Sequence, residues 1–139
     1  MTNVFIDTNI LVSSLDHRDP AKRARAKNIL ANLKARRLTP IISTQVLQEF
    51  CNILTRKLLV SPHNAHAELV ALSGVLTIQI TPALILAAAD LHAQASISFW
   101  DALIVAAAQS AGWDQIWTAD LQSGQFFGTT QIMNPFLLP

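Results

Sequence analysis

Short apolar segments alternate with helical segments along the sequence, and this alternation limits the possible folds more than any other feature. The apolar runs are largely free of polar positions, as expected of strands that are buried on both faces. Strands of this kind, separated by helices, indicate a parallel sheet that is covered by helices on both sides. We therefore expect a three-layer α/β/α sandwich with a central parallel sheet of four to five strands, formed by a single domain of residues 1–139.

Local signals place the elements along the chain. Pro20 follows Asp19 at an expected helix start, Ser43 or Thr44 caps a later helix, and Gly112 closes the last one. The expected strands are 4–6, 40–42, 75–80, 115–118 and 131–133. The expected helices are 9–15, 20–37, one that begins after residue 43 or 44, 62 to about 72, 82 to about 95, and 99–111.

The composition excludes several classes of protein. Hydrophobic residues make up 51% of the chain and charged residues 14%, which is too apolar for a disordered chain. The apolar stretches are too short and too interrupted for a membrane span, and the N-terminus has no basic region typical of a secretory signal. Cys51 is the single cysteine, so an intrachain disulfide is impossible. These features favour a cytoplasmic protein that is not bound to a membrane.

Charge is distributed unevenly along the chain. Residues 1–57 contain all ten Lys and Arg and four of the nine acids, a net charge of +6, whereas residues 58–139 carry −5. A basic half suggests a polyanionic partner such as RNA, with Arg23, Lys27 and Lys34 of the expected helix 20–37 as possible contacts. An ordinary solvated helix face explains these residues equally well.

Four carboxylates lie at the edges of apolar runs in four separate parts of the chain. Asp7 and Asp120 follow expected strands, Glu49 lies on a helix that is entered from a strand, and Asp101 lies in the first turn of another helix. In open parallel sheets, ligands bind beyond the carboxyl ends of the strands, so these elements can bring four acids to one cleft. Grouped carboxylates repel one another, and one or two divalent cations would neutralise them.

Each acid also has a simpler explanation. Asp101 can cap its helix, because it stands three residues after Ser98 in a capping-box spacing. Asp120 can be a turn residue, and Glu49 can pair with Arg56 or another basic residue on the surface. Asp7 is the hardest to explain structurally, since a charge directly after Val-Phe-Ile has little use in a core.

Other polar and aromatic residues give weaker signals. Thr8, Asn9 and Thr118 adjoin the acids and can bind metal-bound water or a phosphate, although Thr8 can equally cap the following helix. The four histidines show no spacing typical of metal ligands. The tryptophans are expected in the core, with stacking on nucleic-acid bases as the less favoured alternative: Trp100, Trp113 and Trp117.

The segments around these residues resemble a known family. The segments 5–11, 100–108 and 118–124, together with Glu49 and the terminal 132–136, are similar to the PIN-domain ribonucleases. Each motif is weak by itself, whereas four acids in the right order with the right neighbours are much more specific. The size of the chain also resembles that of VapC-type toxins of toxin–antitoxin pairs.

The resemblance implies a PIN-like fold and a metal-dependent endoribonuclease that hydrolyses RNA phosphodiester bonds. The residues that match the four acids of the family, and would hold Mg²⁺ or Mn²⁺, are Asp7, Glu49, Asp101 and Asp120. Thr118 and Asn9 match supporting polar positions. The family further implies an RNA substrate, a small antitoxin protein as partner, and a homodimer.

Two other readings are less favoured. Receiver domains and haloacid-dehalogenase-type phosphatases also carry an Asp after the first strand, but they use a Lys late in the chain. Here no Lys follows Lys57, and Asn9 stands where the phosphatases have a second Asp. A non-catalytic RNA-binding module is disfavoured because four acids would weaken binding to RNA phosphates.

Overall fold

The computed structural model describes residues 2–137, and none of the helices in this range could cross a membrane. Six strands form one sheet in the order β3-β2-β1-β4-β6-β5. The first five of these pair in parallel, as the sequence predicts, and β5 pairs antiparallel with β6. The strands are β1 (Thr2–Ile6), β2 (Leu38–Ser43), β3 (Leu76–Ile78), β4 (Gln115–Trp117), β5 (Phe126–Phe127) and β6 (Thr130–Met133).

Six α-helices and one short 3₁₀ helix, η1 (Pro135–Leu137), connect and cover the strands in this part of the chain. Five of these helices begin at a polar side chain that accepts a hydrogen bond from a backbone N–H group of the first turn: Asp19, Ser43, Ser61, Thr81 and Ser98. The helices are α1 (Thr8–Ser13), α2 (Pro20–Ala31), α3 (Thr44–Arg56), α4 (Pro62–Ala71), α5 (Pro82–Gln94) and α6 (Phe99–Ser110).

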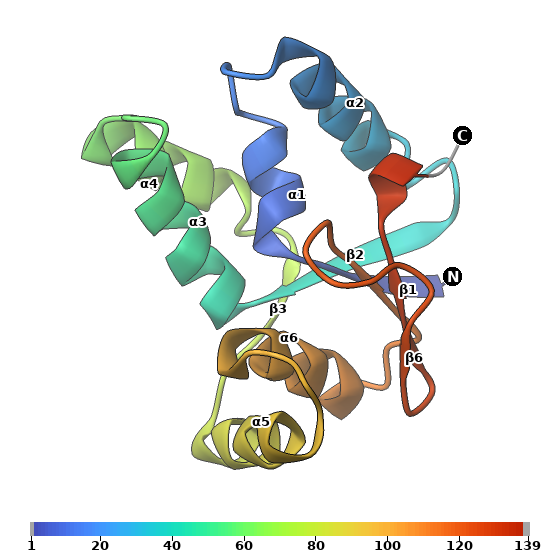
Figure 1. The fold of residues 1–139 in the computed structure, drawn as a ribbon. Helices are drawn as coiled ribbons and strands as arrows, with labels where there is room; N and C mark the ends of the chain where they lie inside the picture. Colours follow the sequence, from blue (N-terminus) through green and yellow to red (C-terminus); the bar gives the residue numbers. More distant parts are fainter. Residues whose placement is uncertain (1, 138–139) are drawn as a thin grey trace.

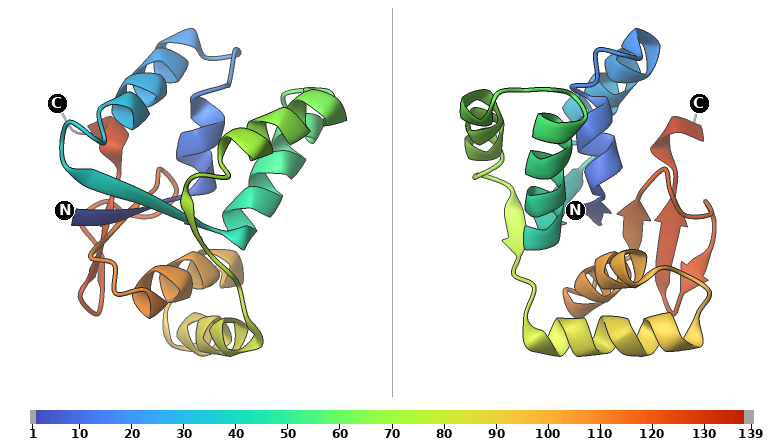
Figure 2. Two further views of the ribbon diagram at one scale, coloured as in Figure 1. Left: turned by 180° about the vertical axis from the view of Figure 1, so that it is seen from behind. Right: turned by 60° about the vertical axis from the view of Figure 1, so that its left-hand side comes forward.

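The sheet separates two groups of helices, which makes the three expected layers (Figure 1). Helices α5 and α6 lie together on one side of the sheet, and α1 and α2 lie on the other, with α3 and α4 beside α1 (Figure 2). Strand β1 is central, with β2 on one side and β4 on the other. The chain order therefore reverses at β1, and such a switch point is where open α/β sheets bind ligands.

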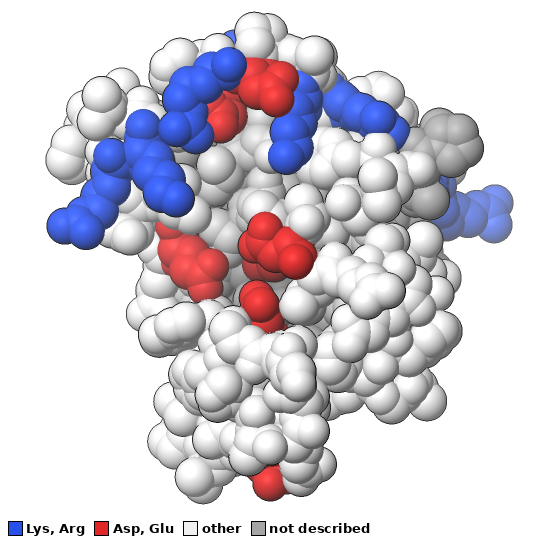
Figure 3. Space-filling model, in the orientation of Figure 1, with Lys and Arg blue, Asp and Glu red and all other residues white. Residues whose placement is uncertain are grey.

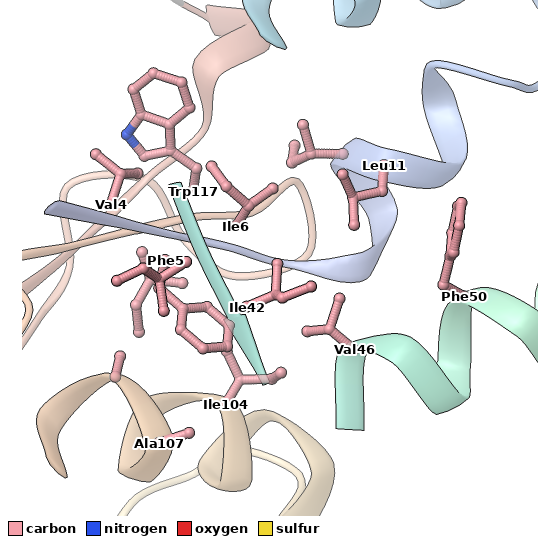
Figure 4. Close-up of a cluster of buried hydrophobic side chains, with 14 of the residues drawn as sticks. Val4, Phe5, Ile6, Leu11, Ile42, Val46, Phe50, Ile104, Ala107 and Trp117 are labelled. Carbon is pink, nitrogen blue, oxygen red and sulfur yellow. The ribbon is translucent and has the colours of Figure 1, made fainter. Parts of the chain in front are cut away.

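The hydrophobic core packs against both faces of β1. Val4 and Ile6 project to one side of the strand, and Phe5 projects to the other side, toward Ile104 and Ala107 of α6 (Figure 4). All five side chains are buried. Because alternate side chains point to opposite faces of a strand, a strand covered on both sides has to be apolar at every position.

Several predicted boundaries differ from the structure. The helix expected over 20–37 ends at Ala31, because residues 32–37 form turns that reverse the chain, with Arg37 in the left-handed region (φ 56°). The helix expected over 9–15 spans 8–13, and the strand expected over 75–80 spans 76–78. Residues 1, 138 and 139 of the predicted domain lie outside the described residues.

The hairpin of β5 and β6 was not predicted. Gly128 and Thr129 join two strands that pair from Phe127 to Thr130, and Gly128 has the positive φ (62°) that such tight turns require. β5 contains only two residues, Phe126 and Phe127, too few for a periodic pattern to appear in the sequence.

Candidate active site

The four acids predicted as a cluster line one pocket beyond the carboxyl ends of β1, β2 and β4. Asp7, Glu49, Asp101 and Asp120 all contribute to this acid pocket, which has a volume of about 280 Å³. Asp7 directly follows β1, and Asp120 lies three residues after β4. Parallel pairing of β1 with β4, in a register that puts Ile6 opposite Trp117, brings these two chain segments together. The pocket therefore lies at the switch point of the sheet.

Asp7 is the most buried of the four acids, with 5% of its surface exposed. Its Oδ1 accepts a hydrogen bond from the Thr8 backbone N–H at 2.7 Å, and its Oδ2 accepts one from Thr118 Oγ1 at 2.8 Å. Burial raises the pKa of Asp7 from 3.8 to about 7, the two hydrogen bonds oppose this rise, and the nearby charges of Glu49 and Asp120 add to it. A cation beside Asp7 would stabilise the ionised carboxylate and offset the cost of burying its charge.

Asn9 and Thr118 connect the ends of β1 and β4 through hydrogen bonds. Asn9 Nδ2 donates to Asp7 Oδ2 at 3.3 Å and to Thr118 Oγ1 at 3.1 Å, and Asn9 Oδ1 accepts from the Ala119 N–H. Thr118 Oγ1 also accepts from the Asp120 backbone N–H at 3.1 Å. These contacts fix the orientation of the Asp7 carboxylate and the start of the Asp120 loop.

Glu49 is held by two neighbours. Thr8 Oγ1 donates to Glu49 Oε2 at 3.1 Å, and Gln45 Nε2 donates to Glu49 Oε1 at 2.6 Å. Gln45 Nε2 also donates to the Trp100 carbonyl oxygen at 3.1 Å, so it joins α3 to the first turn of α6. The surface ion pair suggested for Glu49 and Arg56 is not among the contacts of the described residues.

Asp101 and Asp120 are more accessible to solvent than Asp7. Asp101 lies in the first turn of α6, where its backbone N–H donates to Ser98 Oγ at 3.1 Å, so Ser98 caps the helix and Asp101 lines the pocket. Partial burial raises the pKa of Asp101, a hydrogen bond with Ser98 lowers it, and the charge of Asp120 raises it further. Asp120 is exposed at the pocket rim.

Basic residues border the acids on one side. Figure 3 shows the acidic side chains at the centre of one face, with Lys and Arg along one side of them. Arg18 and Lys57 line the acid pocket itself, and the Arg18 guanidinium also forms an ion pair with Asp16 at 2.8 Å. The residues suggested as RNA contacts lie on α2 or just beyond it and do not line this pocket: Arg23, Lys27 and Lys34. An RNA-binding role for these three stays a prediction.

The donor set of the pocket suits a hard divalent cation, since Mg²⁺ and Mn²⁺ prefer carboxylate oxygens. The raised pKa of Asp7 comes chiefly from the burial of its carboxyl group, and the charges of Glu49 and Asp120 add to it. Among residues 2–137, no three His, Cys, Asp or Glu side chains are already grouped as ligands of one ion. The residues thus fit a metal by their chemistry and shared pocket, and their role as ligands stays a prediction.

Comparison with known proteins identifies the family. The model of the PIN domain matches residues 4–124, which include all four acids. The chain belongs to the PIN domain family. No match was found among curated proteins.

Solved structures share the fold of this PIN domain. VapC20 of Mycobacterium tuberculosis, described as a sarcin-ricin loop cleaving toxin, has a TM-score of 0.63 at 23% identity, covering 84% of this chain and 89% of that one. A toxin–antitoxin complex from Klebsiella pneumoniae gives 0.71 at 22% identity, covering 97% and 99%. VapBC2 from Rickettsia felis, bound to a promoter DNA fragment, gives 0.70 at 19% identity, covering 96% and 98%.

Sequence reasoning missed four polar residues that line the pocket: Ser13, Arg18, Gln45 and Lys57. Gln45 precedes Glu49 by four residues on α3, a spacing that puts both on one side of the helix and was available as a signal. Arg18 and Lys57 lie in the basic half of the chain, but their position depends on how α1 and α3 meet. No local pattern separates these two cations from the other eight.

Proposed function

We propose that this PIN domain is a divalent-metal-dependent endoribonuclease. The observation that carries the proposal is the convergence of four carboxylates, from four separate segments, in one pocket of a chain that belongs to the PIN domain family. Asp7, Glu49, Asp101 and Asp120 would hold Mg²⁺ or Mn²⁺. The bound metal would supply activation of water and stabilisation of charge on the phosphodiester.

The chain itself contributes orientation and attraction of the substrate. Thr118 and Asn9 hold the Asp7 carboxylate, and Gln45 holds the Glu49 carboxylate, so these acids need little rearrangement on binding. Arg18 and Lys57 offer positive charge at the border of a pocket that is otherwise repulsive to phosphates. The RNA backbone therefore enters from the basic side of the pocket.

Cleavage of a structured RNA tests this proposal. We expect cleavage with Mg²⁺ or Mn²⁺ and none with excess chelator. Asp7→Asn should lower the cleavage rate by more than the roughly 10- to 100-fold that is typical of residues that only support a metal ligand. Asp90→Asn removes an exposed carboxylate of α5 that lines neither pocket near the acids, and is the matched control. Cleavage that survives both the chelator and Asp7→Asn would refute the assignment of the site.

We further propose that the enzyme is the toxin of a type II toxin–antitoxin pair, acting in the cytoplasm as a homodimer. Support comes from the fold that it shares with VapC20 and with toxin components of solved complexes. Expression of the wild-type chain should arrest growth, and co-expression of a small protein encoded next to it should relieve the arrest. Asp7→Asn should be harmless, and light scattering should give twice the chain mass of 15.2 kDa.

A further inference from the structure

Trp100 is exposed at the rim of the acid pocket, and the prediction that it belongs to the core is wrong. Its side chain is 63% exposed, whereas Trp113 and Trp117 are 5% and 1% exposed and confirm the core prediction. Exposing a large aromatic surface to water is unfavourable, and such a surface beside a polar cleft often marks a binding site.

A second pocket adjoins the acid pocket at Trp100. It has a volume of about 560 Å³, and Glu49, Trp100, Asp101 and Asp120 line both pockets. Gln48 and Asn52 line the second pocket and not the acid pocket. An RNA whose phosphodiester lies at the acids would therefore extend one neighbouring nucleotide into this space.

Helix α3 contributes three amide side chains to the lining of the second pocket. Gln45, Gln48 and Asn52 lie at positions i, i+3 and i+7, on the same side of the helix as Glu49. No hydrogen bond joins the side chain of Gln48 or Asn52 to another described residue. Gln45 is 3% exposed, and its Oε1 atom is buried without a hydrogen-bond partner among the described residues. Amides can both donate and accept, as the edges of nucleobases do.

The indole contacts a neighbouring aromatic ring. Phe99 contacts Trp100 edge to face, with ring centroids 5.3 Å apart and an interplanar angle of 75°. The Trp100 carbonyl oxygen is also fixed, because it accepts the hydrogen bond from Gln45 Nε2. A supported aromatic ring loses little conformational entropy when a planar ligand stacks on it.

We propose that the second pocket binds one unpaired nucleobase next to the scissile phosphodiester, stacked on Trp100 and recognised at its edge by Gln48 and Asn52. The inference rests on the proposed ribonuclease function and adds the recognition of a single-stranded nucleotide. Unpaired RNA bases stack on aromatic side chains and are read by amide groups at their edges. The RNA then crosses the cleft, with its phosphates on the side of Arg18 and Lys57 and this base on the side without Lys or Arg.

An abasic substitution tests the stacking directly. The substrate is an RNA hairpin cleaved by the wild-type enzyme, with the base on the 5′ or the 3′ side of the cut replaced by an abasic site. At one of these positions the loss of the base should lower kcat/KM of the wild type roughly 5- to 150-fold. In the Trp100→Ala variant, the same loss of the base should change kcat/KM less than about twofold, because this variant has already lost the stacking partner.

Substitutions at Trp100 separate stacking from apolar packing. Trp100→Phe keeps a flat ring and should retain most of the activity, whereas Trp100→Leu keeps apolar bulk and should resemble Trp100→Ala. Phe126→Ala is the matched control, because Phe126 is an exposed aromatic residue (59%) that lines neither pocket. Equal activity of the Phe and Leu variants would overturn the stacking proposal, and so would an equal abasic effect in wild type and Trp100→Ala.

The amides predict base preference. Each of the variants Gln48→Ala and Asn52→Ala should change the order in which the four bases are preferred for cleavage at the position that is sensitive to the abasic substitution. The base preference at the other loop positions should stay unchanged. Sequencing the products of a hairpin library with a randomised loop measures this ranking. An unchanged ranking in both variants would overturn the recognition by the amides.

A binding assay distinguishes failure of this inference from failure of the proposed function. A 2′-O-methyl RNA hairpin in excess chelator cannot be cleaved, and its binding should protect the exposed Trp100 from fluorescence quenching by acrylamide. Wild-type cleavage without protection would overturn the base pocket and leave the ribonuclease proposal intact. Protection without any cleavage would refute the ribonuclease proposal alone.

A Trp100→Ala variant that binds a protein antitoxin more weakly, yet cleaves and binds RNA normally, would assign the pocket to the protein partner and overturn the inference.

Discussion

Ionisation of Asp7 should make the stability of the metal-free protein fall as pH rises. The pKa of Asp7 is 3.8 in an unfolded chain and about 7 in the folded protein, chiefly because the carboxyl group is buried. Between these two values the unfolded chain releases the proton while the folded protein keeps it. Rising pH therefore favours the unfolded state until about pH 7, above which both states are ionised and the penalty is complete.

The magnitude follows from the separation of the two pKa values. Each pH unit of separation corresponds to about 1.4 kcal/mol, so ionised Asp7 destabilises the fold by about 4 kcal/mol at pH 8. Most of this penalty, about 2 to 3 kcal/mol, develops between pH 5 and pH 8. The hydrogen bonds from Thr118 and Thr8 are already included, because they act on the pKa in the opposite direction.

Asp7→Asn removes the charge at nearly constant shape. The amide oxygen can still accept from the Thr8 N–H, whereas the new NH₂ group faces Thr118 Oγ1 and Asn9 Nδ2, which both donate to Asp7 Oδ2. Losing these two contacts costs about 2 kcal/mol. The variant should therefore be more stable than the wild type by about 2 kcal/mol at pH 8, with an advantage that disappears near pH 5.

Urea denaturation in the presence of a chelator, at several pH values from 5 to 8.5, measures this difference. Asp90→Asn is the control, and its difference from wild type should stay constant with pH. Addition of Mg²⁺ at pH 8 should stabilise the wild type and have little effect on Asp7→Asn, because the ion compensates the charge that the variant lacks. A difference between Asp7→Asn and wild type that does not change with pH would refute the reasoning.

Two further predictions concern residues that sequence reasoning missed. Lys57→Gln should weaken binding of a non-cleavable RNA and reduce the slope of log affinity against log salt by about 0.7 to 0.9, whereas an unchanged slope would show that Lys57 contacts no phosphate. Gln45→Ala should lower the free energy of unfolding by about 1 to 3 kcal/mol in urea titrations and also lower RNA cleavage, since Glu49 loses its 2.6 Å hydrogen bond. Normal cleavage in a destabilised Gln45→Ala variant would limit Gln45 to a structural role.

The elements that were predicted well are those with strong local signals. The apolar run of β1 and the caps at Asp19 and Ser98 are visible in a few neighbouring residues, and the structure has each of them in place. The end of α2 was predicted six residues too late, since Leu33 continues the apolar spacing although it lies in a turn. Leu33 is buried all the same, so its apolar character reports burial and not helix.

Trp100 shows a different kind of error. The segment 102–108 that follows it is buried throughout, whereas Trp100 is 63% exposed. The first turn of α6 instead lies at the rim of two pockets. Burial at a helix end depends on which neighbouring elements reach that end, and the helix sequence does not contain this information.

The sequence alone determined the alternation of strands and helices, the uneven charge and the positions of four acids beside apolar runs, because each depends on neighbouring residues. Only the tertiary structure decided that the acids share a pocket. Asp7 and Thr118 are 111 residues apart in the chain, yet their side chains form a 2.8 Å hydrogen bond. That contact exists because β4 pairs with β1 and not with β3, and strand order results from packing of the whole chain. The same packing leaves Trp100 exposed beside the acids.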